Sequence, residues 1–275
     1  MSEWSPWGLD ASAISELRLS RAIKALDAGD PVTAALEAEE LLDEDPDNLE
    51  AIVLVGEASL DQVCFATARI AFQHALSIDG ELIKAWAGLS LACYELTDLE
   101  ACASSAQEGL RLNEEDPALW YYLAVALEQL NHHERAEQAF SQAARIDGAN
   151  FPKPLRHAPE LWAQALTSAM ELLPATLRDW YQRFTVEVHR FPDIEELRSA
   201  EPPLSPAAGA LYLGTPPTLG FGDPWATQPE KVRVFTGNLE RGAPQPCDMA
   251  RMVALALRQE ALDWLGLDDH TLRLS

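Results

Sequence analysis

The first half of the chain repeats itself every 34 residues, and this period restricts the folds it can adopt. Ile52, Trp86 and Trp120 stand 34 positions apart. Small residues recur with the same spacing at two places in each unit: Ala22, Gly56, Ser90 and Ala124, and then Ala34, Ala68, Cys102 and Ala136. Turn-forming pairs separate the units at Asp45-Pro46, Asp79-Gly80, Asp116-Pro117 and Asp147-Gly148. Each unit is therefore predicted to be two helices that cross at small side chains and stack on the next unit.

This pattern resembles the tetratricopeptide repeat, a two-helix unit of about 34 residues. Residues 61–76 and 131–144 are similar to its second helix. The resemblance covers four units over residues 15–150, after an N-terminal extension of residues 1–14. Arg18 stands in the first unit where later units have Ile52 and Trp86, a departure typical of terminal repeats, which face water on one side. The prediction for this half is an α-solenoid.

In this family the first helix of each unit lines a concave groove that binds peptides. The resemblance implies a groove formed by Glu50, Glu57, Asp61, Lys84, Tyr94, Glu95, Tyr121 and Glu128. A clamp for a C-terminal carboxylate is not expected, because Lys84 is the only base among them. The acids and tyrosines predict a basic, partly extended or helical peptide. Two alternatives stay open: the tyrosines pack between repeats, and the acids are a solvated face.

The charge of the chain is strongly negative and unevenly distributed. Residues 1–150 hold 28 Asp and Glu against 8 Lys and Arg, and the whole chain has a net charge of −24. Such a surface repels nucleic acids and anionic membranes, and it attracts basic proteins. General solubility is the alternative explanation. The absence of a long apolar run, a signal peptide and a C-x-x-C pair predicts a cytoplasmic protein whose four cysteines are reduced core residues.

The composition changes at residues 151–159, where three prolines predict a stiff linker or a docking segment. A helix is expected over 160–173 and a shorter one from Pro174 to Tyr181. Alternating residues predict strands at Phe184–His189, Ala210–Gly214 and Lys231–Thr236, with loops at 191–209 and 215–230. Residues 160–275 are thus predicted to form a small α+β domain. The whole chain is predicted to be mainly α.

The last predicted helix follows Asp248, a candidate N-cap, and stops at Gly266. Helical spacing places Gln259 and Asp263 on one face, with Glu260 beside them. A zinc peptidase carries H-E-x-x-H on such a helix, where two imidazoles bind the metal and the Glu acts as general base. Here the same five positions read Gln259-Glu-Ala-Leu-Asp263, so the Glu is kept and both histidines are absent.

The second half resembles the small bacterial zincin-like metallopeptidases. Their signature H-E-x-x-H-H-F-G-x-D-D is similar to Gln259-Glu-Ala-Leu-Asp-Trp-Leu-Gly-Leu-Asp-Asp269, and Leu173-Pro174, Leu213-Gly214 and Lys231–Arg241 match further family features. The resemblance implies that Gln259, Asp263 and Asp269 occupy the metal-ligand positions and that Glu260 is a vestigial base. We expect Glu260 in a partly buried cleft beside an Arg.

Two functions follow from these resemblances. The first is a non-catalytic protein-interaction adaptor, in which a peptide-binding array is joined to a pseudopeptidase without a cofactor. The second is an active metal-dependent peptidase that holds zinc with Gln259, Asp263 and Asp269 and recruits its substrate through the repeats. The all-oxygen set favours the first, because zinc sites are built mainly from imidazole and thiolate ligands.

Overall fold

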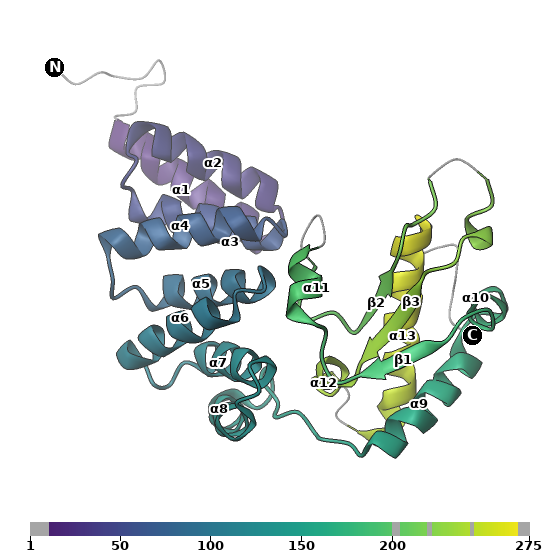
Figure 1. Ribbon diagram of the computed structural model, residues 1–275. Coiled ribbons are helices and arrows are strands. Elements are labelled where there is room, and N and C mark those ends of the chain that lie inside the picture. Colours follow the sequence, from purple (N-terminus) through teal and green to yellow (C-terminus); the bar gives the residue numbers. More distant parts are fainter. Residues whose placement is uncertain (1–10, 200–203, 219–221, 243–244, 269–275) are drawn as a thin grey trace. The chain divides into compact units, whose positions relative to one another are not determined.

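The computed structural model describes residues 11–199, 204–218, 222–242 and 245–268 (Figure 1). The chain divides into two compact units, Met1–Phe151 and Pro152–Ser275. The described part of the first unit is helical, and the second unit combines helices with a three-stranded sheet. The predicted fold class, a helical-repeat solenoid followed by a small α+β domain, is confirmed.

The first unit consists of four helical hairpins that stack in sequence order, as the purple-to-teal ribbon in Figure 1 shows. The first helices of the hairpins are α1 (Ala11–Asp27), α3 (Leu49–Asp61), α5 (Ile83–Glu95) and α7 (Pro117–Gln129). The second helices are α2 (Pro31–Glu44), α4 (Phe65–Ile78), α6 (Leu99–Leu112) and α8 (His133–Asp147). The helix α1 starts at Ala11, inside the segment predicted as an extension.

The helices approach closely where the sequence has its periodic small residues. Ala22, Ala34, Ala68 and Cys102 are fully buried. The indole N–H groups also follow the period: Trp86 donates to the carbonyl of Gly80 at 2.9 Å, and Trp120 donates to that of Glu114 at 2.8 Å. These bonds tie α5 and α7 to the turns that precede them. The sequence period is therefore also a period of packing and of hydrogen bonds.

The second unit has a sheet with helices on both faces. Its helices are α9 (Pro159–Leu172), α10 (Ala175–Tyr181), α11 (Ile194–Ser199), α12 (Thr236–Leu239) and α13 (Met249–Leu265). Its strands are β1 (Val186–His189), β2 (Ala210–Leu213) and β3 (Lys231–Phe235), and its 3-10 turns are η1 (Pro224–Ala226) and η2 (Pro246–Asp248). The sheet order is β1-β3-β2, with β1 parallel and β2 antiparallel to β3.

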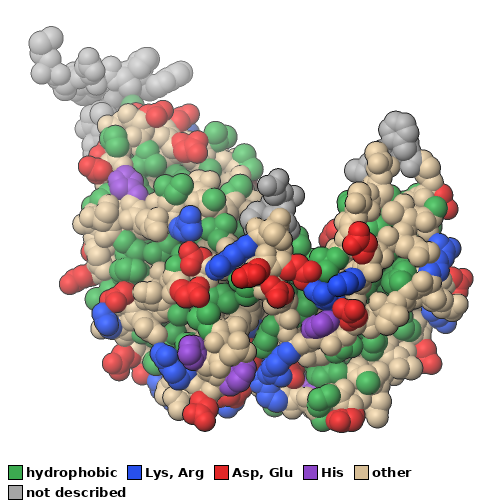
Figure 2. Space-filling view, viewed as in Figure 1, with side chains coloured by type: hydrophobic (Ala, Val, Ile, Leu, Met, Phe, Trp, Pro, Cys, Tyr) green, Lys and Arg blue, Asp and Glu red, His purple; other side chains and the backbone are tan. Residues whose placement is uncertain are grey.

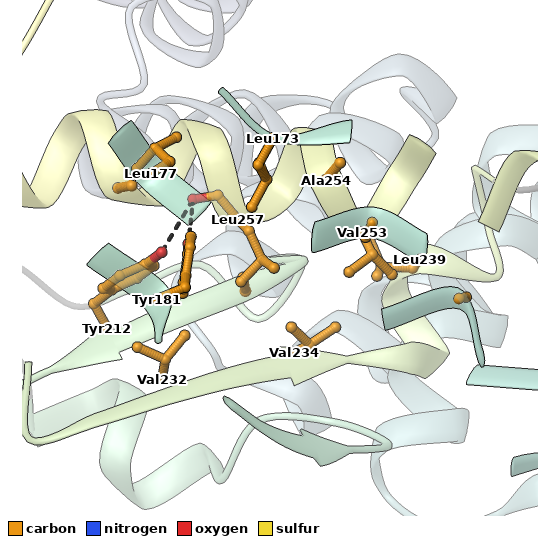
Figure 3. Packing of buried hydrophobic residues seen from close by; sticks show 14 of the residues in the cluster. Leu173, Leu177, Tyr181, Tyr212, Val232, Val234, Leu239, Val253, Ala254 and Leu257 are labelled. Atoms are coloured by element: carbon orange, nitrogen blue, oxygen red, sulfur yellow. Dashed lines mark hydrogen bonds between the residues drawn. The ribbon is translucent and has the colours of Figure 1, made fainter. Parts of the chain in front are cut away.

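The main core of the second unit lies between the sheet and the helices α9, α10 and α13. Val232 and Val234 of the central strand β3 face this core (Figure 3). Two tyrosine hydroxyls converge on one carbonyl of α13: Tyr181 and Tyr212 donate to Leu257 O at 3.0 and 3.1 Å (Figure 3). Because Tyr181 ends α10 and Tyr212 lies on β2, this carbonyl fixes three elements together.

The other face of the sheet has a smaller core that was not predicted from the sequence. Residues 191–209 were predicted as a loop, but they contain the helix α11, whose Leu197 is fully buried with Leu211 and Phe235. On this face Arg233 of β3 donates to Glu187 of β1 at 3.2 Å and also pairs with Glu196 of α11. The prediction was wrong because the flanking prolines obscured a six-residue helix.

The C-terminal end of the Pro-rich segment docks onto the second unit. The Arg156 guanidinium donates to Glu240 Oε2 at 2.9 Å, and the His157 backbone N–H donates to Glu240 Oε1 at 3.2 Å. Glu240 is buried. A buried carboxylate with an arginine and a backbone donor is compensated, and removing either partner is costly. The segment is thereby held to the second unit rather than left as a free linker.

The four cysteines were predicted to be reduced residues of the core, and this is correct for two of them. All four cysteines are unbridged, but only Cys93 and Cys102 are buried, while Cys64 and Cys247 are exposed. Cys64 is exposed because it occupies the N-cap position of α4. Of the helices within the described residues, none combines the length and the apolar character needed to cross a bilayer.

The turn inside each hairpin places one residue in the left-handed region, again with a period of 34. These residues are Gly29, Val63, Thr97 and Asn131, with φ values of 74°, 59°, 57° and 62°. The amide that follows each one bonds back five residues, as Cys64 N does to Ser59 O at 2.8 Å. Glycine and asparagine tolerate this conformation, whereas a β-branched valine is strained there.

Replacing Val63 with asparagine should therefore stabilise the protein. Val63 is 68% exposed, so its side chain contributes little packing that the change would remove. Asparagine, which the fourth repeat uses at this position, should raise the free energy of unfolding by about 0.5–1.5 kcal/mol. Urea unfolding of the whole chain measures this change. As a control, Val32→Asn makes the same change at an exposed helical position, and an equal stabilisation there would contradict the strain argument.

Candidate functional site

The helix α13 brings the motif residues together at its C-terminal end. It ends at Gly266, whose φ of 65° is left-handed, as predicted for a helix stop. Asp248 occupies the N-cap position, as predicted, but its side chain makes no capping hydrogen bond. Gln259, Glu260 and Asp263 lie on the last turns of the helix, within about one turn of one another.

The two positions that match zinc ligands are bonded to each other. The Gln259 side-chain amide donates to both carboxylate oxygens of Asp263, at 3.1 and 3.2 Å. Both residues are exposed. Within the described ranges no three His, Cys, Asp or Glu side chains group into a metal site. Asp269, the third expected ligand, lies outside the described residues. An amide and a carboxylate that satisfy each other do not fit zinc, which takes imidazole and thiolate ligands first.

Glu260 differs from its neighbours on the helix because it is half-buried. Burial, and then the charge of Asp263, raise the pKa of its carboxyl to about 7. The expected arginine is not present: throughout the described chain, no group donates a hydrogen bond to Glu260 or forms an ion pair with it. The prediction of partial burial is confirmed, and the prediction of a compensating arginine is wrong.

Aromatic rings from four elements surround this part of α13. Trp180 and Tyr212 are stacked, with ring centroids 6.0 Å apart and an interplanar angle of 10°. Trp264, one turn beyond Glu260, lies 6.1 Å from Trp180 and 6.3 Å from Tyr212. Trp225 of η1 packs edge-on against Trp180 at 5.9 Å. This cluster could not be predicted from the sequence, because rings from separate elements share no spacing in the chain.

The residues predicted for the peptide groove lie on α3, α5 and α7, the first helices of the last three hairpins. Glu50, Asp61 and Lys84 are exposed, and Glu57 is half-buried. Lys84 Nζ lies 2.6 Å from Glu57 Oε1, so the one base of the set pairs with an acid of the preceding hairpin. Glu50, Glu57, Asp61 and Glu95 are here called the acidic first-helix face.

Three other members of the predicted groove are buried or packed against other side chains of the array. Tyr94 is 4% exposed, and its hydroxyl accepts a hydrogen bond from Gln129 at 3.0 Å. Glu128 is 1% exposed. Tyr121 packs against Phe140 and Phe151, with centroids 5.9 and 5.5 Å away. The expectation that Tyr94 and Glu128 are open to a ligand is therefore corrected: a sequence period gives the face of a helix but not its depth.

The carboxylates of the first unit are spread over its surface. Figure 2 shows the red side chains dispersed over the visible face of this unit rather than gathered at one spot. Several are paired, as Glu115 is with Arg145 at 2.9 Å and Glu108 with Arg111 at 2.8 Å. The acidic first-helix face is thus one part of a generally acidic surface.

The raised pKa of Glu260 predicts a dependence of stability on pH. In the unfolded chain this carboxyl loses its proton near its ordinary pKa of 4.5, and in the folded protein it does so near 7. The free energy of unfolding should therefore fall as the pH rises through this window and stay low above it. Glu260→Gln removes the charge and should stabilise the protein above pH 7 by on the order of 1–3 kcal/mol.

Urea unfolding of the full chain on both sides of this window measures the effect. Glu230→Gln, the same change at an exposed position of the second unit, is the control and should leave the pH dependence unaltered. If Glu260→Gln destabilises the protein above pH 7, then the carboxylate is compensated by a partner and the argument from burial is wrong.

Comparison with known proteins identifies a family in each unit. A profile described as zincin-like metallopeptidase matches residues 181–275, and one described as tetratricopeptide repeat matches residues 117–150. Among curated proteins, the general transcriptional corepressor ssn6 of Schizosaccharomyces pombe is 26% identical over 139 residues. That match covers 50% of this chain and 12% of the corepressor, so the chain spans about an eighth of that protein's length.

Solved structures of repeat proteins are similar to part of this chain. A crystal structure of MamA is 21% identical, with a TM-score of 0.44, and the match covers 46% of this chain and 74% of MamA. The tetratricopeptide protein TTC0263 of Thermus thermophilus is 18% identical, with a TM-score of 0.44 and coverages of 48% and 74%. The period, the hairpin stack and the two profiles agree: this chain joins a tetratricopeptide-repeat array to a zincin-like metallopeptidase-type domain.

Proposed function

We propose that this protein is a non-catalytic adaptor, in which the repeat array binds a protein partner and the zincin-like domain has no peptidase activity. The observation that carries the proposal is the hydrogen bonding of Gln259 to both oxygens of Asp263. In an active zincin these two positions hold imidazoles that bind the metal. Here the two side chains satisfy each other.

This pairing bears on catalysis through the attacking water. A zinc peptidase works because the metal lowers the pKa of its bound water toward about 7, so that a carboxylate can take the proton. A primary amide is a poor zinc ligand, and a carboxylate that already accepts two hydrogen bonds is less available to a metal. Without that metal, Glu260 has no activated water to deprotonate.

One observation favours the alternative of an active peptidase. The pKa of Glu260, raised to about 7, is close to the value that suits a general base at neutral pH. That value has a simpler cause here, because burial beside Asp263 is sufficient to produce it. The two functions differ in their requirement for metal, since only the peptidase needs a bound ion.

Purified protein is therefore expected to contain no stoichiometric zinc, and chelator should leave its melting temperature unchanged. Metal-site formation normally contributes to the stability of a zinc domain, so removal of a bound ion would lower the melting temperature. Elemental analysis and thermal unfolding with and without chelator provide the test. The paired variant Gln259→His/Asp263→His, which restores both imidazoles, should acquire zinc and a chelator-sensitive melting temperature. One zinc per chain in the natural protein would overturn the adaptor proposal.

The partner of the array is proposed to be a basic peptide that contacts the acidic first-helix face. Glu50 lies in the first turn of α3 and Asp61 ends the helix, and both are exposed. Lys84 neutralises only Glu57. Lysine and arginine side chains of a partner would gain from these charges, mainly through faster association. The tyrosines contribute less than the sequence suggests, because Tyr94 is buried and Tyr121 already packs against Phe151.

Reversing Glu50 and Asp61 to lysine should weaken the binding of a basic peptide by about tenfold. Fluorescence anisotropy with a labelled peptide of alternating lysine and alanine measures the dissociation constant, and the affinity should fall as salt rises. The matched control reverses Glu39 of α2 and Glu134 of α8, which are exposed on second helices. If the control weakens binding equally, then the peptide responds to net charge and not to this face.

A further inference from the structure

Exposed apolar side chains cluster at the start of the second helices of the first two hairpins. Val32 and Leu36 lie one turn apart on α2 and are both exposed. Ala66 and Ile70, which are exposed too, occupy the equivalent places on α4, 34 residues later. Val63 is exposed in the turn just before α4. These five residues are here called the apolar second-helix patch.

One hydrogen bond brings the two halves of this patch together. The Gln62 side-chain amide donates to the Pro31 carbonyl at 3.2 Å, so the turn that carries Val63 lies against the start of α2. Val32 directly follows Pro31 there. Apolar residues scattered singly over a surface need no explanation, whereas a continuous exposed patch marks a site of interaction.

The array does not need apolar residues at these positions in order to fold. The third and fourth hairpins have Glu100 and Glu134 where the first two have Val32 and Ala66, and they have Ser104 and Gln138 where the first two have Leu36 and Ile70. The four polar residues are exposed as well. The contrast is therefore between surfaces and not between cores.

The backbone of Val63 provides a second observation. Its φ of 59° strains a β-branched residue, and the fourth hairpin uses Asn131 at this place. Thr97, the counterpart in the third hairpin, is fully buried, so packing within the array offsets its strain. The exposed side chain of Val63 gains no comparable packing. Strain that the fold itself does not use is typical of residues that serve a binding surface.

The charge beside the patch indicates what covers it. Glu39 and Asp43 continue the line of Val32 and Leu36 along α2 at helical spacing, and both are exposed. The helix has five acidic residues and no basic one. A second copy of the chain would bring the same acids to the contact, and an anionic membrane would bring the same sign of charge, so both are disfavoured.

We propose that the apolar second-helix patch binds an amphipathic helix of a partner protein, one with lysine or arginine beside its apolar stripe. Such a helix places apolar residues three and four positions apart against an apolar surface, and its basic flanks would meet Glu39 and Asp43. This inference goes beyond the proposed function, because the acidic first-helix face lies on the other helices of the hairpins. An adaptor of this kind has two separate binding surfaces.

The test uses two labelled amphipathic peptides with the same leucine stripe, one with lysines and one with glutamates on the polar face. Fluorescence anisotropy with the full chain gives their dissociation constants. The lysine peptide is expected to bind saturably and at least about tenfold more tightly than the glutamate peptide. Leu36→Ser/Ile70→Gln, which installs residues that the later hairpins carry, should weaken the lysine peptide by at least about tenfold.

A second variant and a matched control separate this surface from the rest of the array. Val63→Asn should weaken the lysine peptide while it stabilises the protein, so it decides the matter if the double variant does not fold. The control, Ile78→Gln/Leu112→Gln, changes exposed apolar residues at the last positions of α4 and α6 and should leave both constants unchanged. The peptide of alternating lysine and alanine, which has no apolar stripe, should bind the natural protein and the Leu36→Ser/Ile70→Gln variant equally.

Three results would overturn the proposal. The first is equal binding of the lysine peptide by the natural protein, the double variant and Val63→Asn. The second is the absence of saturable binding, or equal affinity for the two amphipathic peptides. The third is a dimer of the natural protein in analytical ultracentrifugation that Leu36→Ser/Ile70→Gln dissociates, since the patch would then be covered by a second copy. None of these results bears on the metal analysis or on the acidic first-helix face, so the two proposals can fail separately.

Discussion

The array depends on one ring that is enclosed by two glycines. Phe72 of α4 lies so close to Gly56 of α3 and Gly88 of α5 that an added Cβ would stand 2.7 and 2.4 Å from its carbons. One side chain thus sets the spacing of two first helices, and any larger residue at either glycine would have to displace it. Phe140, two periods later, instead contacts Tyr121, which packs against Phe151 where a further repeat would begin. The array ends where this arrangement is replaced by an aromatic cap.

A comparable constraint organises the second unit. The carbonyl of Leu257 accepts from the hydroxyls of Tyr181 and Tyr212, so α10, β2 and α13 meet at a single buried oxygen. Burial, together with the nearby charge of Glu260, raises the pKa of Tyr181, which keeps its hydroxyl a donor. This point lies two residues before Gln259. The turn of α13 that carries Gln259, Glu260 and Asp263 is therefore held by the core.

Much of the fold could be predicted from the sequence because period is a local property. The 34-residue spacing locates the helices, and Gly29 and Asn131 mark the turns, but Val63 and Thr97 give no sign that their backbone is left-handed. The burial of a side chain is harder to predict than the helix face on which it lies. Tyr94 and Glu128 lie on the expected helices and are nevertheless buried. The partial burial of Glu260 could be predicted, but the aromatic rings near it could not. Trp264 lies on the same helix, but Trp180, Tyr212 and Trp225 come from other elements, and tertiary packing alone brings them together.

Two carboxylates near the end of α13, three residues apart, have different surroundings. Asp263 is exposed and accepts both hydrogen bonds from an amide, so its charge is inexpensive to keep. Glu260 is half-buried among rings with no donor, so its charge lowers the stability of the folded protein. A hydrophobic residue would fill the same space without that cost. Groups held in a costly state by the surrounding fold concentrate at sites that bind or react. At the end of α13 the charge of Asp263, which stands where a zincin holds its metal, is therefore kept at low cost, and the charge of Glu260 at high cost.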